Sequence, residues 1–229
     1  MDWIDKLVEW YKINARDLPW RRTRDPYAIW ISEIMLQQTR VAAVIPYYER
    51  FLRELPDVFA LAHVDDGRLH KLWERLGYYS RARNLKKAAG EIVSRFGGSM
   101  PQNYAELITL SGIGEYTAGA IASIAFGEAV PAVDGNVLRV YARLFGVERD
   151  IRDPAFKKEV RAFLLPLIPM EEPGVFNAAL MELGATVCLP NGKPVCAECP
   201  VRESCVAFRE NRTAELPVLS AKKARKIER

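Results

Sequence analysis

An all-α fold is predicted by three features of this sequence. Apolar residues recur at helical spacing along almost the whole chain. No two segments show the alternation that a pair of half-buried strands would need. The segments between the helical stretches are short, so the connections are short. With 229 residues, the chain can also bury a hydrophobic core.

The helices follow in order from their apolar periods and end signals. The opening helix has one apolar face, which Asp2 is placed to cap, and that face consists of Trp3, Leu7, Trp10 and Tyr11. A second helix begins at Asp25-Pro26 and runs through Gln38. Glycines at 97, 98 and 127 are stop signals. Further helices are predicted over 41–54, 66–76, 80–96, 104–110, 115–126, 135–146, 154–165 and 173–187.

The composition is that of an ordinary soluble protein, because 49% of the residues are hydrophobic and 27% are charged. No apolar run reaches the roughly 18 residues of a membrane span, so no membrane partner is expected. The first five residues lack the basic and apolar regions of an export signal, which predicts a cytoplasmic location. The net charge of +4 permits a nucleic-acid partner. Residues 216–229 form a basic C-terminal tail, whose charges favour a solvated segment.

The four cysteines of the chain all lie within one short segment, at Cys188, Cys196, Cys199 and Cys205. Thiolates gathered at one site repel one another unless a metal centre binds them. Only Cys196 and Cys199 form the short knuckle that zinc modules use in pairs, whereas a four-thiolate [4Fe–4S] cluster tolerates uneven spacing. The pattern therefore favours a [4Fe–4S] cluster. Zinc is the next alternative and two disulfides the last, since no export signal precedes the segment.

Glu33 is the single carboxylate in a segment that is apolar on most faces. The apolar residues around it are Ile29, Trp30, Ile31, Ile34, Met35 and Leu36. A helix of this kind should be buried, and burial should raise the pKa of Glu33 so that it can act as a general acid. A buried glutamate paired with an arginine is the structural alternative. Gln37 and Gln38 follow, and glutamine side chains suit hydrogen bonding to base edges.

Asp134 follows an apolar stretch and precedes a predicted helix. Capping that helix is its simplest role. The helix dipole and amide hydrogen bonds should hold such a carboxylate in its charged form. One protonated and one charged carboxyl group are the pair that cleaves glycosidic bonds through an oxocarbenium-like transition state. Glu33 and Asp134 are therefore the candidate catalytic pair.

Gly112 and Gly114 stand in a tight turn between two predicted helices. Glycine allows positive φ and the close approach of another group. Amides at the start of the second helix would then face an anion such as phosphate. The alternative is a glycine-closed helical hairpin that binds no ligand.

Two segments combine aromatic residues with arginines. Residues 76–84 hold the adjacent Tyr78 and Tyr79 with two arginines close by, and residues 16–22 place Trp20 beside Arg21. Aromatic rings next to cations suit insertion into a base stack with phosphates nearby. Core packing of at least one tyrosine is the alternative.

Together these motifs resemble the helix-hairpin-helix superfamily of DNA glycosylases, over residues from about 3 to 217. Within that superfamily the chain looks like the MutY-type adenine DNA glycosylases, without their C-terminal Nudix-like domain. The motifs that carry the likeness are Ser32-Glu-Ile-Met-Leu-Gln-Gln-Thr39, Gly77-Tyr78-Tyr79, Val133-Asp134-Gly135-Asn136 and Glu182-Leu183-Gly184-Ala185.

The resemblance implies two lobes: a six-helix barrel lobe over 22–130 that contains the helix-hairpin-helix, and a [4Fe–4S] cluster lobe made of 1–21 and 131–215. It implies a monofunctional enzyme that hydrolyses the N-glycosidic bond of adenine mispaired with 8-oxoguanine or guanine. Its partner would be double-stranded DNA containing a mismatch or an oxidised guanine, bound by a monomer associated with the nucleoid. The four cysteines would bind the cluster.

The resemblance also implies a role for each candidate residue. Glu33 would protonate the extruded adenine and then activate a water. Asp134 would stabilise the sugar cation, and Tyr116 and Asn136 would orient it. The adenine pocket would be lined by Trp20, Arg21 and Leu36. Gln38 and Tyr78 would enter the duplex around the opposing guanine. The amides near Gly112 and Gly114 would bind a phosphate.

Two alternatives to the adenine enzyme are open. Thymine- or uracil-mismatch DNA glycosylases share the scaffold and can carry a tyrosine at the position of Tyr116. The related endonuclease III-type lyases place a lysine there, and a phenol cannot form the imine that a lysine forms. The Gln-Gln and Gly-Tyr-Tyr segments favour the adenine reaction. A metal-stabilised DNA-binding module without catalysis is the other alternative, but it gives no reason for a buried Glu33.

Overall fold

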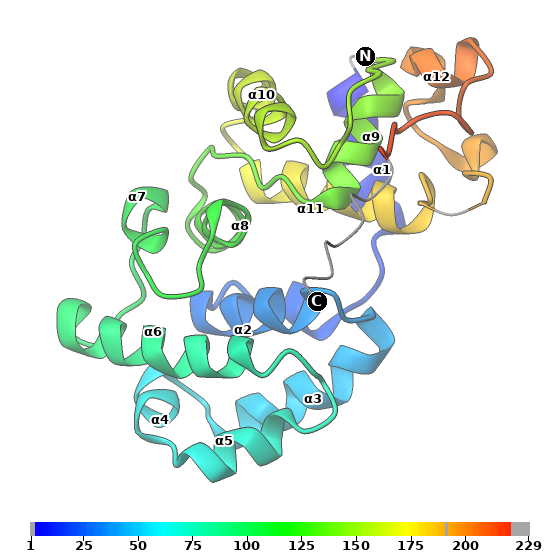
Figure 1. Cartoon of the computed structure of the whole chain (residues 1–229). Helices are drawn as coiled ribbons and strands as arrows, with labels where there is room; N and C mark the ends of the chain where they lie inside the picture. Colours follow the sequence, from blue (N-terminus) through cyan, green and yellow to red (C-terminus); the bar gives the residue numbers. More distant parts are fainter. Residues whose placement is uncertain (1–2, 191, 221–229) are drawn as a thin grey trace, which may run out of the picture. The chain divides into compact units, whose positions relative to one another are not determined.

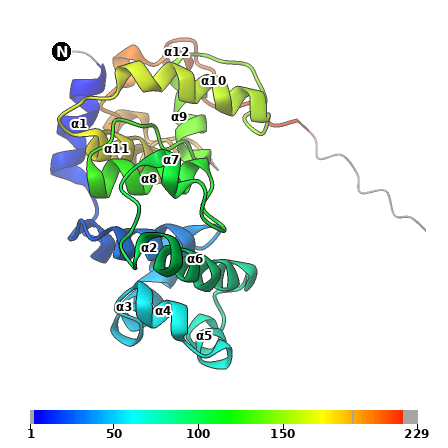
Figure 2. The same cartoon turned by 90° about the vertical axis from the view of Figure 1, so that its left-hand side faces the viewer.

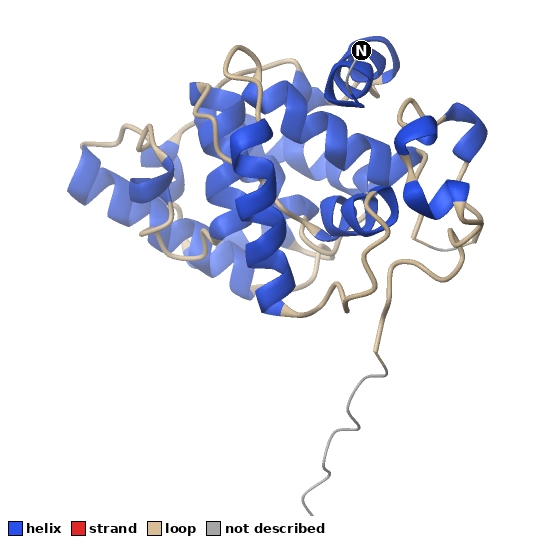
Figure 3. Cartoon of the chain, turned by 90° about the horizontal axis from the view of Figure 1, so that it is seen from above, coloured by secondary structure: helices blue, strands red, loops and turns tan. Residues whose placement is uncertain are grey.

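The computed structural model describes residues 3–190 and 192–220. These residues form helices joined by loops, with no strand among them (Figure 3), and one isolated parallel bridge pairs Asp150 with Val218. The predicted all-α fold is confirmed. No helix in this part of the chain is long and apolar enough to cross a membrane. The expected cap at Asp2 and residues 221–229 of the basic tail lie outside the described residues.

The chain divides into two compact units. Unit 1 takes its described residues from 1–15, 133–167 and 178–229, and unit 2 consists of 16–132 and 168–177. The resemblance implied that residues 16–21, 131–132 and 168–177 belong to the cluster lobe, but they lie in unit 2. For 168–177 the reason is visible in the hydrogen bonds of Asn177, whose side chain contacts Ser123, Val130 and Ala132 of that unit.

Unit 2 is built around one buried helix. Its elements are η1 (Pro19–Arg21), α2 (Pro26–Leu36), α3 (Val41–Glu54), α4 (Val58–His63), α5 (Asp66–Trp73), α6 (Ser80–Phe96), α7 (Tyr104–Leu107) and α8 (Glu115–Phe126). Helix α2 packs against η1, α3, α6 and α8 (Figures 1 and 2). Every residue from 27 to 35 is buried, as its apolar sequence predicts. Asp25 caps the helix by accepting a hydrogen bond from the amide of Tyr27.

Several helix ends in unit 2 match the sequence prediction and others do not. The bounds of α3, α6 and α8 agree, and α6 and α8 stop at Gly97 and Gly127, both in the left-handed conformation. Helix α2 ends two residues early because Gln38 has a positive φ of 58°. Helix α5 ends at Trp73 rather than 76, and Arg75 has a φ of 73°. Helix α4 was not predicted, because six residues are too few to show a helical period.

Unit 1 contains the cysteines. Its elements are α1 (Trp3–Asn14), α9 (Gly135–Leu144), α10 (Pro154–Leu164), η2 (Leu165–Leu167), η3 (Cys196–Glu198), η4 (Arg202–Ser204) and α12 (Val206–Arg209); α11 (Pro173–Thr186) begins in unit 2 and continues into unit 1. Helix α9 packs against α10 and α12. Tyr141 of α9 lies against the rings of Phe145, Phe156 and Phe163, and Trp3 of α1 meets Phe145 edge-on. Aromatic packing therefore joins α1, α9 and α10.

Candidate functional site

Glu33 lies in the middle of α2 and is 6% exposed. Its neighbours along the helix, Ser32 and Ile34, are also buried. The expected burial of this carboxyl group is therefore confirmed. The hydroxyl of Ser32 donates to the carbonyl of Ile29, so it is satisfied within the helix.

The residues expected to line the adenine pocket are also in unit 2, in different environments. Trp20 is 7% exposed and belongs to the hydrophobic core, where its ring meets Tyr48 edge-on at 5.4 Å. Burial raises the pKa of Tyr48 to about 12. Arg21 donates through Nη1 to the carbonyl of Arg16 at 3.0 Å. Leu36 is half-buried at the last position of α2, three residues after Glu33.

Gln38 and Tyr78 lie on two exposed segments with an unusual backbone. Their φ angles are 58° and 47°, in the left-handed region that side chains other than glycine rarely adopt. Gln38 is exposed, and Tyr78 is 57% exposed. The two adjacent glutamines differ, because Gln37 is half-buried and its Nε2 lies 3.5 Å from the hydroxyl of Thr117 in α8. Of the two, only Gln38 is available to a base edge.

Of the two arginines that follow the tyrosine pair, only one is exposed enough to contact a phosphate. Arg81 is 8% exposed and donates to backbone carbonyls, so its guanidinium cannot reach a phosphate. Arg83, in contrast, is exposed. The sequence could not distinguish the two, because only the tertiary structure buries one side of α6.

The hairpin between α7 and α8 carries the two candidate phosphate-binding glycines. Gly112 has a φ of 76°, and a Cβ there would lie 2.7 Å from the Cβ of Asn84. Gly114 caps α8 with a φ of −92°, and a Cβ there would meet nothing within 4 Å. The positive φ expected of this turn is thus found at Gly112 alone. Tyr116 is half-buried in the first turn of α8.

Glu91 fixes the hairpin turn to α6, a contact that the sequence did not predict. Its carboxylate accepts hydrogen bonds from the Ser111 amide at 2.8 Å and the Ser111 hydroxyl at 2.6 Å. Burial acts to raise the pKa of Glu91, but these hydrogen bonds together with the charges of Lys87 and Arg95 outweigh it, and the pKa is lowered overall. The turn is therefore held by a charged carboxylate.

A small polar cavity lies beside this hairpin within unit 2. Its volume is about 30 Å³, and it is lined by Trp30, Ile34, Gln37, Arg81, Asn84, Leu85, Ser111 and Gly112. The lining residues come from α2, from α6 and from the hairpin turn. A cavity of this size holds one or two water molecules, not a nucleobase.

Asp134 belongs to unit 1, where it caps α9 as predicted. Its Oδ1 accepts a hydrogen bond from the amide of Val137 at 2.8 Å, and its Oδ2 accepts one from Nδ2 of Asn136 at 2.7 Å. The expected direction of its pKa shift is wrong. Burial raises the pKa of Asp134, and this outweighs the lowering by the hydrogen bonds from Val137 and Asn136 and by the charge of Arg139.

A chain of hydrogen bonds runs from Asp134 to the cysteine segment within unit 1. Arg139 donates through Nη2 to Oδ1 of Asn136 at 2.8 Å and through Nε to the carbonyl of Cys188 at 2.8 Å. It also donates to the carbonyl of Gly184 at 2.7 Å. A Cβ at Gly184 would lie 2.6 Å from the Cβ of Asn136, so the glycine allows α11 to approach α9.

The four cysteines are half-buried in one part of unit 1. Burial raises the pKa of Cys196, Cys199 and Cys205, that of Cys199 to about 12, and the charges of neighbouring cysteines raise each further. These thiols therefore lie close enough for their charges to interact. In the described part of the chain, no group of three or more His, Cys, Asp or Glu side chains is arranged to hold a metal ion.

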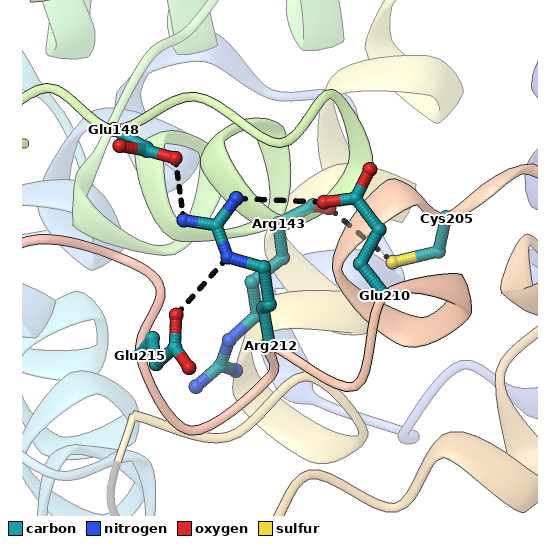
Figure 4. Close-up of polar contacts among 6 residues, drawn as sticks. All are labelled: Arg143, Glu148, Cys205, Glu210, Arg212 and Glu215. Carbon is teal, nitrogen blue, oxygen red and sulfur yellow. Dashed lines mark hydrogen bonds and ion pairs between the residues drawn. The ribbon is translucent and has the colours of Figure 1, made fainter.

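Two arginines anchor the cysteine segment (Figure 4). Arg143 donates to the sulfur of Cys188 at 3.3 Å. Its own carbonyl accepts from the thiol of Cys205 at 3.4 Å. Arg212 bonds three glutamates, at Glu148, Glu210 and Glu215. Because these glutamates are exposed, Arg212 contributes little stability and mainly orients the chain that follows Cys205.

DNA glycosylases are among the known proteins that this chain resembles in sequence. It is 43% identical over 222 residues to the adenine DNA glycosylase of Mus musculus, a match that covers 93% of this chain and 43% of the mouse protein. It is 32% identical over 211 residues to the thymine-DNA glycosylase of Aeropyrum pernix, covering 90% of this chain and 94% of that protein. The chain thus spans about two fifths of the mouse protein and nearly all of the archaeal one.

Solved structures of DNA glycosylases and of endonuclease III are also similar to this chain. A thermostable thymine-DNA glycosylase has a TM-score of 0.81 and 29% identity, covering 90% of this chain and 95% of that chain. Endonuclease III, trapped as a covalent intermediate with DNA, has a TM-score of 0.77 and 25% identity, and the match covers 91% of this chain and 94% of that chain. The family described as HhH-GPD superfamily base excision DNA repair protein matches residues 31–166. The chain therefore belongs to the HhH-GPD superfamily of base excision DNA repair proteins.

Proposed function

We propose that this protein is an adenine DNA glycosylase, which binds mismatched double-stranded DNA as a monomer and hydrolyses the N-glycosidic bond of adenine opposite 8-oxoguanine or guanine. The observation that carries the proposal is the burial of one carboxyl group, Glu33, inside an otherwise apolar helix. An ionisable group in such a place is costly to keep unless it has a chemical task. The name of the mouse relative supports adenine as the base.

In the proposed reaction, Glu33 donates a proton to the extruded adenine, which weakens the bond between base and sugar. The departing base leaves an oxocarbenium-like sugar, and Glu33, now a carboxylate, accepts a proton from the attacking water. Asp134 stabilises the sugar cation by its negative charge. A nearby cation favours the ionised form of a carboxyl group, so the raised pKa of Asp134 falls when the sugar becomes charged.

The other candidate residues support this reaction by orientation and binding. Asn136 orients Asp134 through their hydrogen bond of 2.7 Å, and Tyr116 assists it. Trp20, Arg21 and Leu36 line the adenine pocket. Gln38 and Tyr78 enter the duplex, in keeping with their exposure. The amides near Gly112 and Gly114 bind a phosphate, and the open space around Gly114 leaves room for one.

We also propose that the four cysteines hold a [4Fe–4S] cluster. Three thiols whose charges interact unfavourably in a half-buried site favour a cationic metal centre among them. Zinc modules use short cysteine knuckles in pairs, and only Cys196 and Cys199 form one here. The uneven spacing of the four cysteines in the sequence therefore favours the cluster over zinc. The bound cluster would stabilise the fold of the cysteine segment.

The cluster proposal has a direct check. Purified protein should be brown, with broad absorption near about 400 nm and about four iron atoms per chain, as expected of four-thiolate clusters. A colourless protein that contains one zinc per chain would show that the assignment of the metal is wrong.

The catalytic proposal is tested by Glu33→Gln, which keeps the size of the side chain and removes its acid. The variant should bind an A:8-oxoG duplex with affinity near that of the wild type and release no adenine in single-turnover assays. Glu74→Gln, at an exposed position of the same unit, controls for the loss of charge and should remain active. Full activity in Glu33→Gln would exclude Glu33 as the acid.

A second candidate substrate is thymine or uracil opposite guanine. The specific observation in its favour is the archaeal thymine-DNA glycosylase, which this chain matches over 94% of its length. Base release from duplexes that contain A:8-oxoG, A:G, T:G and U:G separates the two candidates. Release from the adenine duplexes alone supports the adenine assignment, and release from the T:G or U:G duplexes alone replaces it.

A further inference from the structure

Arg81 is a buried cation in unit 2 that has no carboxylate partner among the described residues. It is 8% exposed, and its guanidinium donates hydrogen bonds to carbonyl oxygens and one hydroxyl. Burial lowers the pKa of its guanidinium, but an arginine stays charged at neutral pH. A buried charge is tolerated only where hydrogen bonds replace its hydration. The positions of those bonds therefore indicate what the residue does.

One side of the guanidinium holds the end of α2. Nη1 lies 2.8 Å from the carbonyl of Ile34, 2.9 Å from that of Met35 and 2.6 Å from that of Gln37. The last carbonyls of a helix have no partner within the helix, and they carry its negative dipole end. Arg81 therefore caps the helix that contains Glu33, although it lies more than forty residues away in sequence.

The other side holds the turn before α6. Nη2 donates to the carbonyls of Leu76 and Gly77, both at 3.2 Å, and to the hydroxyl of Thr39 at 3.3 Å. The guanidinium also lies over two rings, those of Trp73 and Tyr78, each at 5.4 Å from its carbon. One side chain thus contacts both segments by hydrogen bonds and by cation–π packing.

The residues between these contacts are Gln38 and Tyr78. Gln38 stands between two residues bonded to Arg81, Gln37 and Thr39. Tyr78 directly follows Gly77, and its carbonyl accepts from the Arg81 amide at 2.9 Å. Both are in the left-handed conformation, which a free chain would leave. A strained backbone persists only where surrounding contacts determine it. Arg81 supplies such contacts to both segments, beside local ones such as the hydrogen bond from Nε1 of Trp73 to the carbonyl of Gly77 at 3.1 Å.

We propose that Arg81 is a positioning residue that locks the segments of Gln38 and Tyr78 in a single geometry, so that both side chains are presented to the duplex together. This inference rests on the proposed function, in which these two residues enter the DNA. Arg81 does not touch the substrate. Its loss should slow the extrusion of adenine from the duplex, because one or both inserting side chains would then be displaced.

The test compares Arg81→Lys with a matched control, Arg50→Lys. Lysine keeps the charge but cannot donate to both segments at once. Arg50 is also a partly buried arginine of unit 2. Its guanidinium donates to the carbonyl of Leu72 at 3.1 Å and lies 4.8 Å from the centre of the Tyr47 ring. Single-turnover adenine release from an A:8-oxoG duplex should fall about tenfold or more in Arg81→Lys and change less than about twofold in Arg50→Lys; a factor of ten corresponds to about 1.4 kcal/mol.

A mutant cycle separates positioning from general loss of structure. In a background with Gln38→Ala and Tyr78→Ala, Arg81→Lys should have almost no further effect, because the residues it positions are gone. A tenfold loss that persists in this background overturns the proposal, as does equal activity of Arg81→Lys and Arg50→Lys. Fluorescence of 2-aminopurine beside the adenine should report less unstacking in Arg81→Lys.

A milder substitution covers the case in which Arg81→Lys does not fold. Thr39→Val removes one hydroxyl acceptor on the Gln38 side at nearly constant volume, and should reduce the rate by about two- to threefold only when Gln38 and Tyr78 are present. An unchanged rate in Thr39→Val would then overturn the proposal. If the wild type releases no base from any mismatched duplex, the proposed function is wrong. If the wild type is active but substitution of Arg81 leaves the rate unchanged, only the positioning role of Arg81 is wrong.

Discussion

Asn177→Ala is expected to destabilise the protein by about 3 kcal/mol, and the size of the effect follows from the partners of this side chain. Asn177 is 1% exposed in unit 2. Its Oδ1 accepts from the amide of Ala132 at 3.0 Å, and its Nδ2 donates to the hydroxyl of Ser123 and the carbonyl of Val130, both at 2.9 Å. The side chain therefore joins residues 168–177 to the rest of unit 2.

The three partners do not contribute equally. Ala132 is 1% exposed, so its amide would be left buried without an acceptor, at a cost of about 1–3 kcal/mol. Ser123 also bonds the carbonyl of Ala120 at 3.3 Å, and Val130 is half-buried, so each of these two should lose only about 0.5–1 kcal/mol. The sum is about 2–5 kcal/mol, and most of it belongs to the amide of Ala132.

Urea unfolding followed by circular dichroism and by tryptophan fluorescence measures this difference, and coincident transitions support a single unfolding step. Asn103→Ala is the control, because Asn103 is an exposed helix cap that accepts from the Glu106 amide at 2.9 Å and should cost only about 1 kcal/mol. Ser123→Ala should cost less than Asn177→Ala, and the double variant should show coupling. If Asn177→Ala costs no more than Asn103→Ala, the three bonds are not buried and the reasoning is wrong.

Two further substitutions test charge and packing. Asp134→Asn should raise the melting temperature at pH 7 while abolishing base release, because burial holds the pKa of Asp134 above its ordinary 3.8 and asparagine also caps helices. As pH rises, the carboxyl group of Asp134 loses its proton at a lower pH in the unfolded state than in the folded state, so wild-type stability falls above about pH 4. The advantage of the variant in melting temperature should therefore vanish near that pH. A difference that is the same at all pH values would contradict the argument. Gly119→Ala should destabilise by about 1–3 kcal/mol, since its Cβ would lie 2.5 Å from the carbonyl oxygen of Pro131. Gly90→Ala, exposed within α6 with nothing near its Cβ, should stabilise by up to about 1 kcal/mol, and thermal unfolding of the pair decides whether close packing at Gly119 is the cause.

Local signals predicted most of the helical framework. Glycines after α6 and α8 adopt the left-handed conformation expected of helix ends, and both helices have the predicted bounds. The cap of α2 at Asp25 and that of α9 at Asp134 were also foreseen, because a capping side chain bonds amides only two or three residues away. Helix α4 lacked any such period, and its packing against α6 stabilises it together with the cap at Asp57.

Those features of the candidate site that depend on residues close together in the sequence could be predicted. The burial of Glu33 followed from its apolar neighbours in one helix. The pKa of Asp134 did not, because the sequence indicates the capping amides but not how much solvent the fold removes from the carboxyl group. The roles of Arg81 and Asn177 were also hidden, since their partners lie about forty or more residues away along the chain.

The amino-acid sequence alone therefore determined the helices, their caps and the identity of the chemically active groups, because these depend on residues within a few positions of one another. Tertiary structure alone decided which of two neighbouring glutamines faces solvent, which of two neighbouring arginines is buried, and that the pKa of Asp134 is raised. Those properties depend on desolvation and on hydrogen bonds between distant segments, and both arise only when the helices pack.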